Sequence, residues 1–185
     1  MKSTTHNKAL LLVISFSVIV LGGTVYSASQ DVVIEGTIQD SKVFDGPARV
    51  TVRAMTIKPG EALPWHYHPG HAFNVVKSGS ETVDDGCGAS QTLTPGQGFE
   101  EIDGRVHRGR NISATDVVVY DTFITVGGQP TTVNIPGNVP RCGPPRDADE
   151  CRNGGWRKFD HPQKFKNQKE CVDFARRRPS PFHNL

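Results

Sequence analysis

Histidine is the residue type in this chain whose spacing points most clearly to chemistry. The sequence has seven histidines, and four of them occur in two short segments: His66, His68 and His71 in PWHYHPGHAF, and His107 in IDGRVHRGRN. If residues 63–68 are extended, His66 and His68 point to one face of a sheet, because alternate side chains of a strand share a face. Neutral imidazoles bind Zn, Cu, Fe and Ni well. The pair therefore predicts two ligands of one metal ion at a strand end.

A third ligand has to come from another part of the chain. His107 follows Asp103-Gly104, a turn signal at the end of a later strand-like run. From the end of a neighbouring strand, its side chain can reach the cavity into which His66 and His68 point. Burying several imidazoles without an ion would leave polar groups to satisfy, so the grouping favours a metal. The alternative is a barrel whose histidines no longer bind a metal and whose pocket is empty or holds only solvent.

The segments around these histidines alternate like β-strands. From residue 31 to about 126, short runs rich in β-branched residues are separated by Gly, Pro and Asp. The expected strands are 32–35, 49–57, 72–77, 81–83, 91–94, 98–102 and 117–126. The run 49–57 carries apolar residues on both faces, which requires cover on both sides, as in a closed double sheet. The predicted fold class is therefore all-β, a sandwich or barrel.

These segments resemble the cupin family. Its first motif is a glycine, five residues, His-x-His, three or four residues, Glu, six residues and a glycine, and it is fitted by Gly60, His66, His68 and Gly79. Its second motif is a glycine, five residues, Pro-x-Gly, two residues, His, three residues and Asn. It is fitted by Gly96, Gly104, His107 and Asn111, with Ile102 at the proline. The resemblance covers about residues 31–130 and, through the short segment 80–95, is most similar to small single-domain microbial cupins. It implies a double-stranded β-helix barrel, or jelly roll.

The resemblance implies three metal ligands, His66, His68 and His107, but the chain departs from the family at its metal-binding glutamate. That position is Ala72, or Phe73 with the longer spacing, and neither side chain binds an ion.

Other residues are candidates for the missing ligand. His71 is a less certain metal ligand. It directly precedes position 72, and adjacent residues of a strand point to opposite faces of the sheet. Glu100 and Glu101, in the second motif, are acidic candidates that a solvated strand edge explains equally well.

The metal and the function follow from this ligand set. A divalent ion is expected, with Fe, Zn or Cu favoured and Mn or Ni as alternatives. A three-histidine site leaves positions for substrate and dioxygen, and the resemblance to three-histidine cupin dioxygenases implies a metal-dependent oxygenase or related small-molecule enzyme. The alternative is a non-catalytic extracytoplasmic protein that binds a small ligand or a metal. No general base, nucleophile or cofactor loop decides between them, and catalytic residues stay unassigned.

The first residues predict export. A run of about fifteen uncharged, mostly apolar residues, 9–23, is followed by Ser27-Ala28-Ser29, a small-residue cleavage site. We expect a signal peptide over 1–29, a secreted or periplasmic protein, and no stable membrane insertion after cleavage; an uncleaved N-terminal anchor is the alternative. The run is short for a span, which needs about twenty residues.

Four cysteines are present, Cys87, Cys142, Cys151 and Cys171, without metal-like spacing. In an oxidising compartment they should form two disulfides. Of three connectivities we favour Cys151 with Cys171, which closes the tail on itself, and Cys87 with Cys142, which ties the tail to the body.

Composition separates a body from a tail. The chain has 185 residues, 36% apolar and 22% charged, with a net charge of +2, which fits one modest globular domain and excludes disorder. We expect the barrel over 30–136 and a linker and basic tail over 137–185, with a short helix that Asp160 caps and whose first position is Pro162. A small-molecule ligand is the main expected partner. The tail would suit an anionic cell-surface polymer, nucleic acid is not expected, and a homodimer stays open.

Overall fold

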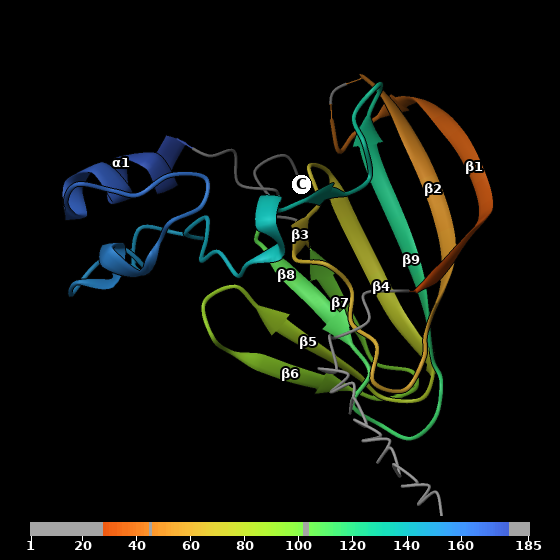
Figure 1. Ribbon diagram of the computed structural model, residues 1–185. Helices are drawn as coiled ribbons and strands as arrows, with labels where there is room; N and C mark the ends of the chain where they lie inside the picture. Colours follow the sequence, from red (N-terminus) through yellow and green to blue (C-terminus); the bar gives the residue numbers. More distant parts are fainter. Residues whose placement is uncertain (1–27, 45, 102–103, 178–185) are drawn as a thin grey trace, which may run out of the picture.

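Two five-stranded antiparallel sheets make up the body of the computed structural model, which describes residues 28–44, 46–101 and 104–177 (Figure 1). The long sheet has the order β1-β2-β9-β4-β7 and the short sheet β10-β3-β8-β5-β6. The long sheet contains β1 (Ser29–Ser41), β2 (Gly46–Ile57), β4 (His71–Ser78), β7 (Gly98–Glu101) and β9 (Val117–Val126). The short sheet contains β3 (His66–Tyr67), β5 (Glu81–Asp85), β6 (Ser90–Leu93), β8 (His107–Arg110) and β10 (Val133–Asn134). The predicted all-β jelly roll is confirmed.

Period-two alternation explains how the long sheet packs. β2 and β9 pair without a bulge from Ala48 opposite Val126 to Ile57 opposite Val117. Along β9 every second residue is buried, which turns Val117, Val119 and Phe123 inward. Val117 and Val119 pack with Met55 and Ile57 of β2 in a core. Burial of apolar surface at about 25 cal/mol per Å² makes this register costly to shift.

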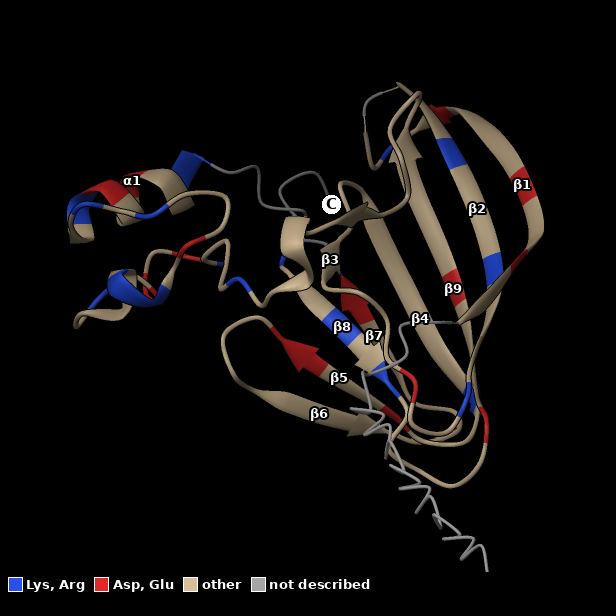
Figure 2. Ribbon diagram, in the orientation of Figure 1, with Lys and Arg blue, Asp and Glu red and all other residues tan. Residues whose placement is uncertain are grey.

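The strand that carries His107 is one that the alternation did not predict. β8 reads His-Arg-Gly-Arg, which lacks the β-branched residues typical of a strand. Long-range ion pairs fix it instead, because Arg108 Nε and Arg110 Nε both donate to Asp84 Oδ2 of β5, at 2.9 and 2.8 Å. Gly109, between them, leaves room for a buried carboxylate of β5: a Cβ there would collide with Glu81. The charges of β8 (Figure 2) thus hold the strand in place.

The C-terminal tail forms its own small core around a disulfide. As far as residue 177, the last that the structure describes, it contains short 3₁₀ turns at Pro136–Asn138 and Gly155–Lys158 and the helix α1 (Gln168–Arg177). Phe159 and Phe165 are buried against Cys151 and Cys171, which are bonded to each other. A second disulfide joins Cys142 to Cys87, just beyond β5. Both pairs are the ones that the sequence favours.

The predicted start of the tail helix is wrong. The helix begins at Gln168 rather than after Asp160, because Asp160 is used elsewhere: its carboxylate accepts from Cys142 N at 2.7 Å and pairs with Arg141. Asn167 caps the helix instead, and its Oδ1 accepts from Glu170 N at 2.9 Å.

Two features of the structure concern the cellular compartment of the protein. Two disulfides and no free cysteine indicate an oxidising, extracytoplasmic environment. Across the part of the chain that the structure describes, no helix combines the length and the apolar character needed to cross a membrane. The predicted signal peptide falls almost wholly within residues 1–27, which lie outside the described residues.

Candidate metal centre

The three histidines of the two motifs meet inside the barrel. His66 of β3 lies directly opposite His107 of β8, and His68 follows one residue after β3 ends. All three are buried, and one ring nitrogen from each lies within 4.8 Å of the others. Two strands of one sheet thus bring together side chains that are about forty residues apart in the sequence. This cluster suits a divalent metal ion.

The outer nitrogen of every ring is held by the backbone. His66 Nδ1 lies 2.7 Å from Pro64 O, His68 Nδ1 2.7 Å from Thr131 O, and His107 Nδ1 2.9 Å from Arg105 O. A carbonyl oxygen only accepts, so Nδ1 carries the hydrogen in each ring. In the neutral rings, the lone pair is therefore on Nε2, the tautomer that binds a metal when Nδ1 is held in this way. The residues present fit a metal ion.

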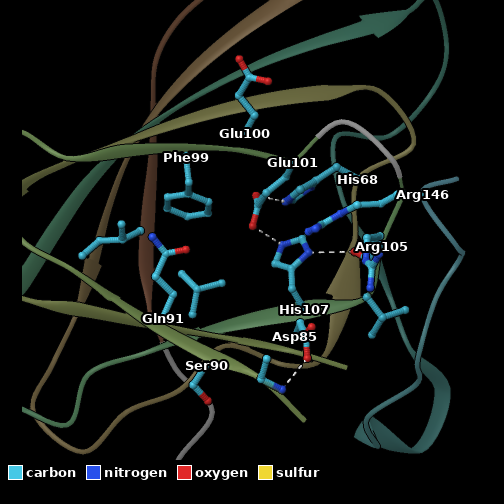
Figure 3. A pocket seen from close by; sticks show the side chains of 15 residues that line it. His68, Asp85, Ser90, Gln91, Phe99, Glu100, Glu101, Arg105, His107 and Arg146 are labelled. Carbon is cyan, nitrogen blue, oxygen red and sulfur yellow. Dashed lines mark hydrogen bonds and ion pairs between the residues drawn. The ribbon is translucent and has the colours of Figure 1, made fainter. Parts of the chain in front are cut away.

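A carboxylate completes the cluster. Glu101, the last residue of β7, places Oε1 2.7 Å from His107 Nε2 and Oε2 3.1 Å from His68 Nε2 (Figure 3). Asn74 of β4 donates to the same Oε2 at 2.8 Å and holds the carboxylate in position. His107 Nε2 has no well-aligned hydrogen bond despite this short distance, so, in the described structure, it is a buried nitrogen without a hydrogen-bond partner.

Burial and charge set the protonation of these groups in opposite directions. Burial, with the neighbouring His107 and His68, lowers the pKa of His66 to about 3 and keeps its ring neutral. Burial acts against the charged forms of His107 and Glu101 as well, but their mutual attraction outweighs it. The pKa of His107 is raised and that of Glu101 is held well below its ordinary value. The metal-free cluster therefore favours an ionised Glu101 beside a protonated His107, and a metal ion that bound His107 Nε2 would displace this proton.

Two further carboxyl groups lie behind the histidines. An inner cavity of about 60 Å³ is lined by the three histidines and Glu101 together with Glu81 and Asp121. Burial raises the pKa of Glu81 to about 8 and that of Asp121 to about 7, and Glu101 adds to both shifts. Glu81 is only 2% exposed, and within the described residues its Oε2 has no hydrogen-bond partner.

These raised pKa values give the metal-free protein a pH-dependent stability. Consider a carboxyl group whose pKa is higher in the folded than in the unfolded state. Its contribution to the stability of the fold is fully present below its unfolded-state pKa and is lost as the pH rises through its folded-state pKa. We expect the free energy of unfolding to fall by on the order of 3 kcal/mol between pH 5.5 and 8.5 because of Glu81. Glu81→Gln, which imitates the protonated carboxyl, should remove most of this slope.

Urea denaturation of metal-free protein at both pH values measures the effect. The exposed Glu100 provides the matched control, since Glu100→Gln should leave the wild-type slope unchanged. Equal slopes for wild type and Glu81→Gln would show that Glu81 ionises normally in the folded protein.

A larger cavity of about 530 Å³ opens beside the metal cluster. His68, Glu101 and His107 form part of its wall, and Val83, Leu93, Phe99 and Val106 supply apolar surface. The tail contributes Arg146, whose side chain extends toward His68 and His107 in Figure 3. Arg105, also in this wall, is paired with Glu150 of the tail at 3.0 Å. A cavity of this size accommodates a small organic molecule in reach of the cluster.

The structure places the other predicted candidates away from this cluster. His71, the less certain candidate for a fourth ligand, lies outside the group of three: its ring is 5.2 Å from that of Phe44 and 6.4 Å from that of Phe73. As alternation requires, its neighbour Ala72 is the residue turned inward, fully buried. Glu100 lines the rim of the cavity and points away from the histidines in Figure 3.

Sequence reasoning did not single out Glu101 over Glu100, nor Glu81, Asp121 and Arg146. A signal for Glu101 was present, because it shares a strand face with the apolar Phe99. Nothing in the spacing pointed to Arg146, which reaches the cavity only because the tail folds back.

Solved structures with this fold have low sequence identity to the chain. A cupin domain protein of Bordetella pertussis is 22% identical, with a TM-score of 0.46, over 57% of this chain and 100% of that chain. A cupin-like protein of Thermotoga maritima is 18% identical, with a TM-score of 0.45, over 60% and 77%. An oxalate oxidase bound to the substrate analogue glycolate is 23% identical, with a TM-score of 0.41, over 47% of this chain and 46% of the enzyme.

The match to a protein family covers part of the barrel. None of the curated proteins matches the chain. Residues 53–123 match the family model described as "Cupin domain", and this segment contains Glu101 and all three clustered histidines. The two sheets have the jelly-roll arrangement that the motifs imply. Residues 53–123 thus match a cupin domain, and this domain carries a three-histidine cluster suited to a divalent metal.

Proposed function

We propose that this protein is an extracytoplasmic metal-dependent oxidoreductase of the oxygenase type, acting on a small organic acid. The observation that carries the proposal is the convergence of three imidazole rings, each with its Nδ1 held by a backbone carbonyl, beside a cavity of about 530 Å³. His66, His68 and His107 would hold the ion. A redox metal such as Fe or Cu supplies electrons to dioxygen when bound, and an ion with open positions also binds substrate.

The wall of the cavity favours a singly charged organic acid. Arg105 is neutralised by Glu150, whereas the Arg146 guanidinium has no ion pair or hydrogen bond with any described residue. Arginine holds a carboxylate through two parallel hydrogen bonds. Asp85 and Glu101 in the same wall would repel a more highly charged anion such as phosphate, and the apolar side chains around Phe99 suit a hydrocarbon body.

A non-catalytic metal-binding or ligand-binding protein is the second candidate. The contact of Glu101 with two of the histidines favours it, because each additional protein ligand leaves fewer positions for substrate and dioxygen.

Metal content and dioxygen uptake separate these functions. The purified protein should contain about one Fe or Cu per chain. It should consume dioxygen with some members of a panel of aromatic and aliphatic carboxylic acids, but not with the corresponding neutral amides. Arg146→Gln should raise the KM for an active acid by about tenfold or more, with metal content unchanged.

Arg152→Gln is the matched control, since Arg152 is an exposed tail arginine paired with Asp149 and does not line the cavity. Bound redox metal without dioxygen uptake on any panel member would favour the non-catalytic candidate. Full uptake by Arg146→Gln at wild-type KM would contradict the role of Arg146.

A further inference from the structure

The inward-facing position at which the family has its glutamate is occupied by Ala72 in this chain. Ala72 is fully buried in β4 and offers no ligand atom. Its cross-strand partner in the antiparallel β4–β7 pair is Glu101. Directly opposite residues of such a pair point to the same face, with Cβ atoms about 5 Å apart. The sheet therefore places a carboxylate on the neighbouring strand beside the position that lacks one.

The small size of Ala72 is what leaves this space open. Glu101 reaches over it to the histidines, with 2.7 Å between Oε1 and His107 Nε2 and 3.1 Å between Oε2 and His68 Nε2. Asn74, two residues after Ala72 on the same face of β4, holds Oε2 at 2.8 Å. The carboxylate is thus oriented before any ion binds.

The contact with His107 is not that of an ordinary hydrogen-bonded ion pair. If His107 Nε2 donated to Glu101, its N–H bond would point at the carboxylate oxygen. Among the described residues, however, His107 Nε2 makes no aligned hydrogen bond. The two atoms lie 2.7 Å apart, yet the ring nitrogen is not aligned to donate to this oxygen. Groups that bind a common ion have this relation, because each directs its lone pair at the ion.

We propose that Glu101 is the fourth protein ligand of the metal ion and replaces, from the opposite strand, the carboxylate that Ala72 lacks. This inference rests on the proposed metal site of His66, His68 and His107. The resulting set of three imidazoles and one carboxylate would leave up to two positions on a six-coordinate ion.

A set of matched variants tests the proposal. Glu101→Ala should weaken Zn²⁺ binding, measured by competition with a chromogenic chelator at pH 7.5, by about tenfold to 100-fold. Glu100→Ala, which removes the neighbouring carboxylate on the other face, should bind within about twofold of wild type. The double variant Ala72→Glu/Glu101→Ala returns a carboxylate to β4 and should recover most of the lost affinity, because the space that Glu101 occupied is free to receive it.

The electron paramagnetic resonance spectrum of the Cu²⁺-loaded protein gives a readout that a structural role would not move. It should change when Glu101 is removed, because an oxygen ligand is lost, and return toward the wild-type spectrum in the double variant. Circular dichroism verifies that each variant is folded.

Three outcomes would overturn the proposal. They are wild-type affinity and spectrum in Glu101→Ala, an equal loss in Glu100→Ala, and a Glu101→Ala loss that the double variant does not recover in affinity or spectrum. A wild-type protein that binds no metal would contradict the proposed function itself, whereas a metal site indifferent to Glu101 would contradict only this ligand.

Discussion

Replacement of His66, His68 or His107 by alanine should each lower the affinity for a divalent metal on the order of 100-fold or more. A metal site of four ligands is worth about 10–16 kcal/mol, so each ligand contributes about 3 kcal/mol, and each 1.4 kcal/mol is a factor of ten. The three variants should be about equally affected, because the rings share one cluster and each Nδ1 is held by a backbone carbonyl. Metal content after dialysis at neutral pH measures the loss.

His71→Ala is the matched control for this series. His71 lies at the start of β4, opposite Ile124, and its ring contacts Phe44 and Phe73 rather than the cluster. The His71→Ala variant also removes one imidazole group from the chain, but it should keep wild-type metal content. Depletion of metal by His71→Ala as complete as in the other three variants, with the fold intact by circular dichroism, would contradict the three-histidine site.

The features that sequence predicted best are those encoded locally. The long runs 49–57 and 117–126 became β2 and β9 because period-two alternation directly reports which face of a strand is buried. The approach of His66, His68 and His107 also followed from spacing, since an extended His-x-His puts both rings on one face. The resemblance to the cupin motifs then pointed to the strand end that supplies the third ring.

The features that sequence missed depend on register between distant strands. Glu101 was distinguished from its neighbour Glu100 only when β4 and β7 paired Ala72 with it, across 29 positions of sequence. β8 forms without β-branched residues because Asp84 of β5 binds both of its arginines. The helix boundary moved for a similar reason, since the predicted cap, Asp160, bonds to Cys142 of the linker instead. In each case a long-range partner outweighed local propensity.

Removal of the Cys151–Cys171 disulfide should unfold the tail and leave the metal site intact. The tail from residue 141 onward is a segment of about 45 residues, and chains near 40 residues rarely fold without disulfides or metals. Its core consists mainly of the two cysteines with Phe159 and Phe165. Closing a loop of 20 residues stabilises by about 3 kcal/mol, which is large for so small a core. Cys151→Ala/Cys171→Ala should therefore be cut rapidly by trypsin within 152–177.

The same double variant should keep wild-type metal content, because His66, His68, His107 and Glu101 all lie in the barrel. The preference for organic acids that we propose should fall in this variant, because the tail holds Arg146 beside the cavity. Arg146 N and Arg105 both bond to Glu150, just before Cys151. Cys87→Ala/Cys142→Ala opens a loop of 55 residues, worth about 4 kcal/mol, and provides the comparison in which the tail core keeps its own disulfide. Loss of metal from Cys151→Ala/Cys171→Ala would show that the barrel depends on the tail, whereas resistance to trypsin would show that the tail core is stable without its disulfide.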